Sequence, residues 1–116
     1  MCMVNNQTIE LTSAAIEASR AEYRSHPFSE ARYAAQQRLE RRSIYKHLPK
    51  GTKIKMMARG GRYFPAVVEA EVIGYRTLYG RVLVMVRFSA VDKNGPKRVA
   101  ATYDLLDLVK RIEEVA

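Results

Sequence analysis

The period of the apolar residues changes at Pro49-Lys50-Gly51, and no other feature of the sequence constrains the fold as strongly. Before this break, apolar residues recur at helical spacing. After it, from Thr52 to Ala58, they alternate with basic residues, as is typical of a half-buried strand. Because proline and glycine end helices, the break predicts a helical arm over residues 1–49 and a β-rich part over residues 50–116. A chain of 116 residues has room for one core, so we expect the two parts to form one compact unit.

The sequence of the helical arm predicts two helices that are joined by a short, Pro-containing turn and form an antiparallel hairpin. Thr12 or Ser13 is a good N-cap for a helix over residues 14–25. Ser29 caps a second helix that ends near Leu48. The side of this second helix that we expect to be buried consists of Ala31, Ala35, Leu39, Ile44 and Leu48.

The residues after Gly51 predict antiparallel β-structure. The β-rich runs are 52–58, 63–75, 80–91 and 97–103, with turns suited to Gly60-Gly61 and Asn94-Gly95. Residues 104–107 indicate one helical turn, and residues 108–112 fit either a closing strand or a terminal helix. The core candidates are Ile54, Val67, Val72, Val82, Val84, Val86 and Val99.

Four short stretches resemble a known family. They are "RYFPAVVEAEV" (62–72), "RVLVMVRF" (81–88), "DKNGPKRVA" (92–100) and "YDLLDL" (103–108). Their order resembles that of a Tudor-like domain, a member of the Src-homology-3-like small barrels, over residues 50–112. The resemblance implies an α+β fold in which the two-helix hairpin precedes a five-stranded antiparallel barrel. It is specific for the fold more than for a function.

Methyl-lysine-binding members of that family carry an aromatic cage. Tyr63, Phe64 and Phe88 match cage positions, but Ser89-Ala90-Val91 stands where a further aromatic residue is expected. A basic rim would also repel a methylated lysine, because the cage holds a cation. The sequence therefore favours a core role for these rings.

The positive charge of the chain is concentrated between residues 38 and 62. This stretch holds nine Lys or Arg residues and one acid, Glu40, and so accounts for the whole formal net charge of +8. Arg38, Arg42 and Lys46 recur at a spacing of four and line one helix face. Such a concentration predicts an anionic partner, either nucleic acid or an acidic protein surface. The candidate binding residues are Arg38, Arg41, Arg42, Tyr45, Lys46, Lys50, Lys53, Lys55, Arg59, Arg62 and Tyr63.

The sequence offers little for catalysis or metal binding. Ser43 and His47 share a helix face, but no nearby acid would orient the histidine. Two histidines and one cysteine stand too far apart for metal-ligand spacing, and there is no phosphate-binding glycine loop. We therefore expect no enzyme, no cofactor and no metal site. Cys2 cannot form an intramolecular disulfide and no signal peptide is recognisable, which favours an intracellular, cytoplasmic protein, with a nucleoid or nuclear location left open.

Together these features predict a non-enzymatic protein that binds DNA or RNA through a continuous basic surface on the second helix and the first strand. The phosphate backbone would be neutralised and a tyrosine would add base stacking. The alternative is a protein-interaction module, such as a phage or mobile-element inhibitor of a nucleic-acid-handling complex. A homodimer through the helical pair or a sheet edge is compatible with either function.

Overall fold

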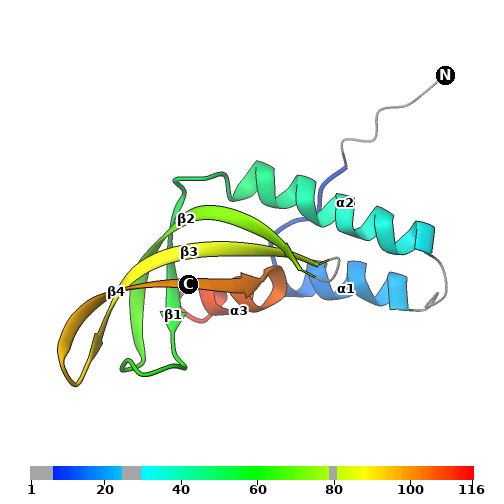
Figure 1. Cartoon of the computed structure of the whole chain (residues 1–116). Helices are drawn as coiled ribbons and strands as arrows, with labels where there is room; N and C mark the ends of the chain where they lie inside the picture. The colour runs from blue at the N-terminus through cyan, green and yellow to red at the C-terminus, as the bar shows by residue number, and fades with distance from the viewer. Residues whose placement is uncertain (1–6, 25–29, 79–80) are drawn as a thin grey trace.

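The computed structural model describes residues 7–24, 30–78 and 81–116, and its fold is α+β (Figure 1). Helices α1 and α2 lie beside each other at one end, and α3 packs behind a single antiparallel sheet. The elements are α1 (Ser13–Arg24), α2 (Glu30–His47), β1 (Lys53–Ala58), β2 (Ala66–Leu78), β3 (Arg81–Asp92), β4 (Gly95–Asp104) and α3 (Leu105–Glu113). The two predicted helices are thus confirmed, whereas the predicted cap at Ser29 lies outside the described residues.

The buried side of α2 is more polar than the sequence suggested. Ile44 and Leu48 are buried as predicted, but Ala31 and Ala35 are exposed. The buried residues inside the helix are Glu40, Ser43 and Ile44. These polar side chains are buried with hydrogen-bonding partners: Glu40 bonds Arg20 of α1, and Ser43 bonds the backbone of Leu39 and Ile9.

The sheet has four strands in the order β1-β2-β3-β4, all antiparallel. β2 pairs with β1 through residues 66–71 and with β3 through residues 71–78, with a bulge between Val72 and Gly74. The structure does not confirm the predicted fifth strand or a closed barrel. The last apolar run forms α3 instead, because Asp104 caps a helix by accepting a 3.1 Å hydrogen bond from Leu106 N.

One core joins the helical arm to the sheet. Four of the predicted core residues are buried, namely Val72, Val82, Val84 and Val86, and Ile54 and Val99 are partly buried against them. The prediction that Val67 belongs to the core was wrong, since Val67 is 55% exposed. It pairs with Met57 on the outward side of β1 and β2, because side chains alternate between the two faces of a sheet. Ile16, Ile44 and Leu48 belong to the same cluster as the strand residues, so the arm and the sheet fold around one core.

The β3–β4 hairpin closes on a charged contact that should respond to acid. Lys97 Nζ lies 2.5 Å from Asp92 Oδ2, and Asn94 N donates to Asp92 Oδ1 at 2.8 Å. The bond with Lys97, and then that with Asn94, holds the pKa of Asp92 below its ordinary 3.8. A lowered pKa stabilises the fold above the ordinary value, and this stability is lost as the pH falls through the lowered one.

We therefore expect the free energy of unfolding of the native chain to exceed that of Asp92→Asn by a constant amount above about pH 5. Below the ordinary pKa of 3.8 the difference should shrink. Urea titrations of both proteins between neutral and acidic pH measure it. A difference that does not change with pH would show that the Asp92 carboxylate contributes no charge-dependent stability.

Candidate functional site

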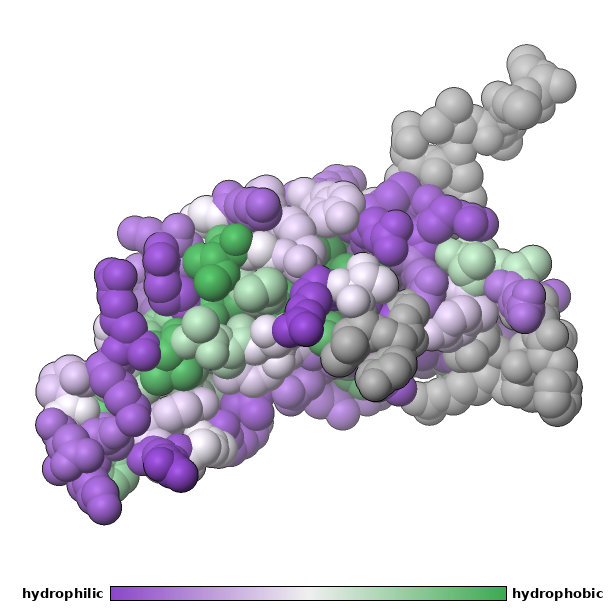
Figure 2. Space-filling model, viewed as in Figure 1, coloured by the Kyte–Doolittle hydropathy of each residue, from purple (hydrophilic) through white to green (hydrophobic). Residues whose placement is uncertain are grey.

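The C-terminal half of α2 carries a basic face. Arg38 and Lys46 are exposed and Arg42 is half-buried, on the helix face opposite Glu40. Arg42 Nε donates to Gln7 O at 3.0 Å, and Arg42 forms no ion pair with an acid among the described residues. Figure 2 shows hydrophilic side chains gathered over the middle of this helix. The predicted alignment of these residues on one face is present, and half-buried Arg41 lies on the strip beside them. We call Arg38, Arg41, Arg42 and Lys46 the α2 basic face.

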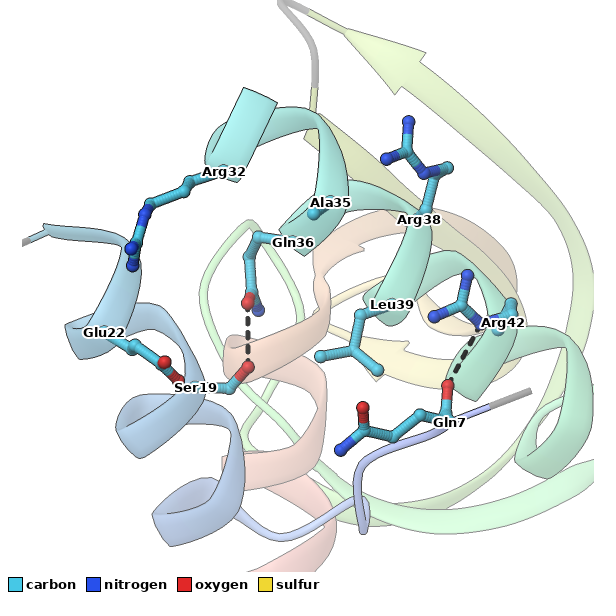
Figure 3. A pocket seen from close by; sticks show the side chains of 9 residues that line it. All are labelled: Gln7, Ser19, Glu22, Arg32, Ala35, Gln36, Arg38, Leu39 and Arg42. Atoms are coloured by element: carbon cyan, nitrogen blue, oxygen red, sulfur yellow. Dashed lines mark hydrogen bonds between the residues drawn. The ribbon is translucent and has the colours of Figure 1, made fainter. Parts of the chain in front are cut away.

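A hollow of about 330 Å³ adjoins this face between α1, α2 and the segment at Gln7 (Figure 3). Leu39 projects toward it, while Ser19 Oγ donates to Gln36 Oε1 at 2.8 Å across one side. Arg38 points away from the hollow in this view. The lining residues are Gln7, Ser19, Glu22, Arg32, Ala35, Gln36, Arg38, Leu39 and Arg42.

Tyr45 is an open ring beside the α2 basic face. It is 51% exposed and meets Tyr75 edge to face, with ring centroids 5.0 Å apart. Tyr75 in turn donates its hydroxyl to Leu48 O at 2.5 Å. Burial is the main cause that raises the pKa of Tyr75, and the neighbouring Tyr45 raises it further. The Tyr75 hydroxyl thus ties the end of α2 to β2, and the Tyr45 ring packs against Tyr75 with about half of its surface open.

The strand part of the basic segment faces acids. Lys53 and Lys55 are exposed on the outward side of β1, where their cross-strand partners are Glu71 and Glu69. Lys53 Nζ lies 4.0 Å from Glu69 Oε1, and Arg87 of β3 lies 3.1 Å from Glu71. This part of the surface therefore carries mixed charges instead of extending the α2 basic face.

The loop after β1 contributes less positive charge than its sequence suggests. Arg59 forms an ion pair with Glu114, whereas Arg62 is exposed. Gly60 and Gly61 adopt positive φ values of 89° and 77°, in agreement with their predicted role as turn residues. Tyr63 packs inward against Phe88, with ring centroids 5.7 Å apart, so its ring is not an open platform. The loop and α2 are attached to opposite ends of β1, with Lys50 exposed at the α2 end (Figure 1).

The most extensive charged network was not foreseen. The Arg20 guanidinium bonds both Glu40, at 2.7 and 3.2 Å, and Asp104, at 2.8 and 3.0 Å. Gln36 Nε2 also donates to Glu40 Oε2 at 2.8 Å. Burial alone would lower the pKa of Arg20, but the bonds to the two carboxylates outweigh it and leave the pKa above its usual value. The network joins α1, α2 and the start of α3, and the one hint in the sequence was Glu40, the lone acid of the basic segment.

Arg111 of α3 is a second structural cation. Its Nη1 donates to Met57 O at 3.2 Å and to Arg59 O at 3.3 Å, and its Cζ lies 4.6 Å from the centre of the Tyr103 ring. Burial, followed by the nearby Tyr63, raises the pKa of Tyr103 to about 12. Arg111 therefore fastens α3 to the end of β1 and is unavailable to a ligand.

Ser43, one of the two residues considered for catalysis, has structural partners, whereas His47 is exposed. Ser43 Oγ donates to Leu39 O at 2.8 Å and accepts from Ile9 N at 2.9 Å, so its hydroxyl is engaged with the backbone. The described residues contain no group of three or more His, Cys, Asp or Glu side chains placed to hold a metal ion. Within the same ranges, no helix has the length and apolar character that crossing a membrane requires.

Comparisons with protein-family models, with curated proteins and with solved structures gave no match to this chain.

Proposed function

We propose that the chain is a non-enzymatic nucleic-acid-binding protein that contacts phosphates through the α2 basic face. One observation carries the proposal. The only acid of the basic segment, Glu40, is turned to the opposite side of α2 and bound to Arg20. Four cations are thus presented together with no acid of their own segment between them. Like charges at this spacing destabilise a helix slightly, and an anionic ligand would relieve that cost.

The mechanism is electrostatic. Phosphate contacts require charge and reach but no particular base sequence, so DNA and RNA are both suitable ligands. Lys53, Lys55 and Arg59 contribute less, because each lies opposite or pairs with an acid. Tyr45, exposed beside the cations, adds a surface on which a base can stack. The cations best placed to contact phosphates are Arg38, Arg41, Arg42, Lys46, Lys50 and Arg62.

Changing Arg38, Arg42 and Lys46 to Gln tests the proposal. With about six phosphates neutralised on duplex DNA, log K should fall with log salt at a slope near −5, a roughly thousandfold loss between about 50 and 200 mM salt. Each lost contact should flatten the slope by about 0.9, so the triple variant should give about −2.5. Glutamine keeps the side-chain length and helix propensity close to those of the native residues. Fluorescence anisotropy of labelled DNA across a salt series measures the slope.

The matched control changes Arg76, Lys93 and Lys110 to Gln, which removes three exposed positive charges outside the segment. Its slope should stay close to the native one. Equal weakening in both triple variants would mean that only net charge matters. If the native chain binds neither DNA nor RNA, the protein-interaction module becomes the better hypothesis, with the same basic face meeting an acidic protein surface.

We also propose that the sheet is a Tudor-like small barrel in which α3 stands in place of the fifth strand, and that the protein acts in the cytoplasm. The support for the barrel is that β2 bends to pair with both neighbours and that Phe64 N donates to Val91 O at 2.8 Å, which draws the loop before β2 onto β3. Slow amide exchange at Phe64 would support this closure. Exchange as fast as in an open loop would contradict it.

A further inference from the structure

An exposed apolar cluster lies at the end of the sheet farther from α2. Phe64 is 58%, Val67 55% and Val91 49% exposed, and only Tyr45 joins them as a large exposed apolar side chain among the described residues. The hydrogen bond from Phe64 N to Val91 O holds two of the three together. We call Phe64, Val67 and Val91 the Phe64 patch; clustered exposed apolar residues of this kind commonly mark binding surfaces.

The Phe64 ring is held out from the body of the protein. Its neighbour Tyr63 points inward and meets Phe88 at an interplanar angle of 81°. Pro65 follows directly and restricts the backbone, while Val91 O fixes the Phe64 amide. The backbone that carries the ring is therefore held in place, which lowers the ordering cost when a ligand meets the ring.

The surroundings of the patch are positively charged. Arg62, two residues before Phe64, is exposed, and exposed Arg98 lies opposite Ser89 on the same sheet face as Val91. The nearby acids have cationic partners. Asp92 pairs with Lys97 and Glu114 with Arg59. Glu69, which follows Val67 on the same face of β2, lies opposite Lys55 and 4.0 Å from Lys53. Arg62 and Arg98 form no ion pair within the part of the chain that the structure describes. An exposed apolar surface beside such cations suits a nucleobase with its phosphates better than it suits an apolar or basic peptide.

We propose that the Phe64 patch is a stacking platform for unpaired bases, so that the preferred ligand is single-stranded nucleic acid; this inference rests on the proposed function. In a duplex both faces of each base are already covered by its neighbours, and only an unpaired base can lay a face on the ring. The phosphates flanking that base would meet Arg62 and Arg98. The α2 basic face supplies affinity for any phosphate backbone, and the patch adds the preference for unpaired strands.

The test compares three variants of the full chain, Phe64→Leu, Phe64→Tyr and Phe64→Trp, on oligothymidylate of about 20 nucleotides and on a duplex of equal length. Phe64→Leu keeps an apolar side chain but removes the aromatic face, so single-strand affinity should fall about 5- to 100-fold while duplex affinity changes less than about twofold. Phe64→Tyr should bind like the native chain. The native sequence has no tryptophan, so Phe64→Trp introduces a unique fluorophore whose emission should be quenched by the single strand and not by the duplex.

The outcomes separate this inference from the proposed function. Native binding with a steep salt dependence but no effect of Phe64→Leu would overturn the platform and leave the α2 basic face in place. An equal loss on single strand and duplex would overturn it as well, because the patch would then not distinguish unpaired bases. If the native chain binds neither form at low salt, both proposals fail. Because Phe64 is exposed, unchanged thermal melting of the variants should show that folding is intact.

Discussion

Val84→Asp is expected to abolish cooperative unfolding of the protein. Val84 has no exposed surface and lies on β3 between its cross-strand partners Tyr75 and Tyr103. A carboxylate at this position would be buried without a cation to pair with, at a cost of several kcal/mol. Domains of this size are stable by only about 5–15 kcal/mol, so most of that margin would be lost. Circular dichroism melting curves measure the effect.

Ser89→Asp provides the matched control, because it places the same charge on the exposed side of the same strand. This variant should melt within a few degrees of the native chain. A native-like melting curve for Val84→Asp would show that the inner face of β3 has been misassigned.

Arg20→Met is expected to lower the free energy of unfolding by about 3 kcal/mol. The substitution leaves Glu40 and Asp104 facing each other without their shared cation, and the three side chains retain only 11–23% of their exposure. Removing one partner of such a network is strongly destabilising because the remaining charge is unpaired. Urea denaturation at neutral pH measures the loss.

Replacing Glu40 by Gln in the Arg20→Met background should recover part of the stability, because it removes one unpaired carboxylate. Lys53→Gln is the surface control, since its 4.0 Å contact with Glu69 is exposed and should contribute less than about 1 kcal/mol. A loss for Arg20→Met no larger than that of Lys53→Gln would mean that water satisfies the two carboxylates.

Local sequence patterns predicted where the helices and strands lie better than they predicted which of their side chains are buried. The break at Pro49-Lys50-Gly51 and the alternation after it located α2 and β1 correctly, because period and helix terminators are local properties. Val67 was assigned to the core because it is apolar and β-branched, but the register with Met57 turns it outward. Residues 105–113 form a helix because of the cap at Asp104 and the spacing of Leu105, Leu108 and Val109. From the sequence alone, residues 108–112 could have formed either this helix or a closing strand.

For the candidate site, too, the sequence predicted which residues carry the charge but did not predict which residues lie beside them. The concentration of charge was visible in the sequence, but the acids opposite Lys53 and Lys55 come from β2 and depend on strand register. Arg20 and Asp104 are 84 positions apart, so no local pattern relates them. Composition also gave no basis for choosing between Tyr63 and Phe64, of which one packs inward and the other is open to solvent.

The contacts of Arg111 with Met57 O and Arg59 O have a consequence for self-association. They occupy carbonyl groups at the end of β1, and α3 packs against that strand, so its free side is a poor template for an incoming chain. At the opposite side of the sheet, β4 pairs with no second strand within the described ranges. Each molecule then has one edge suited to strand addition. Two copies joined through β4 would use up both open edges, so this mode of association ends at a closed dimer and does not propagate into filaments.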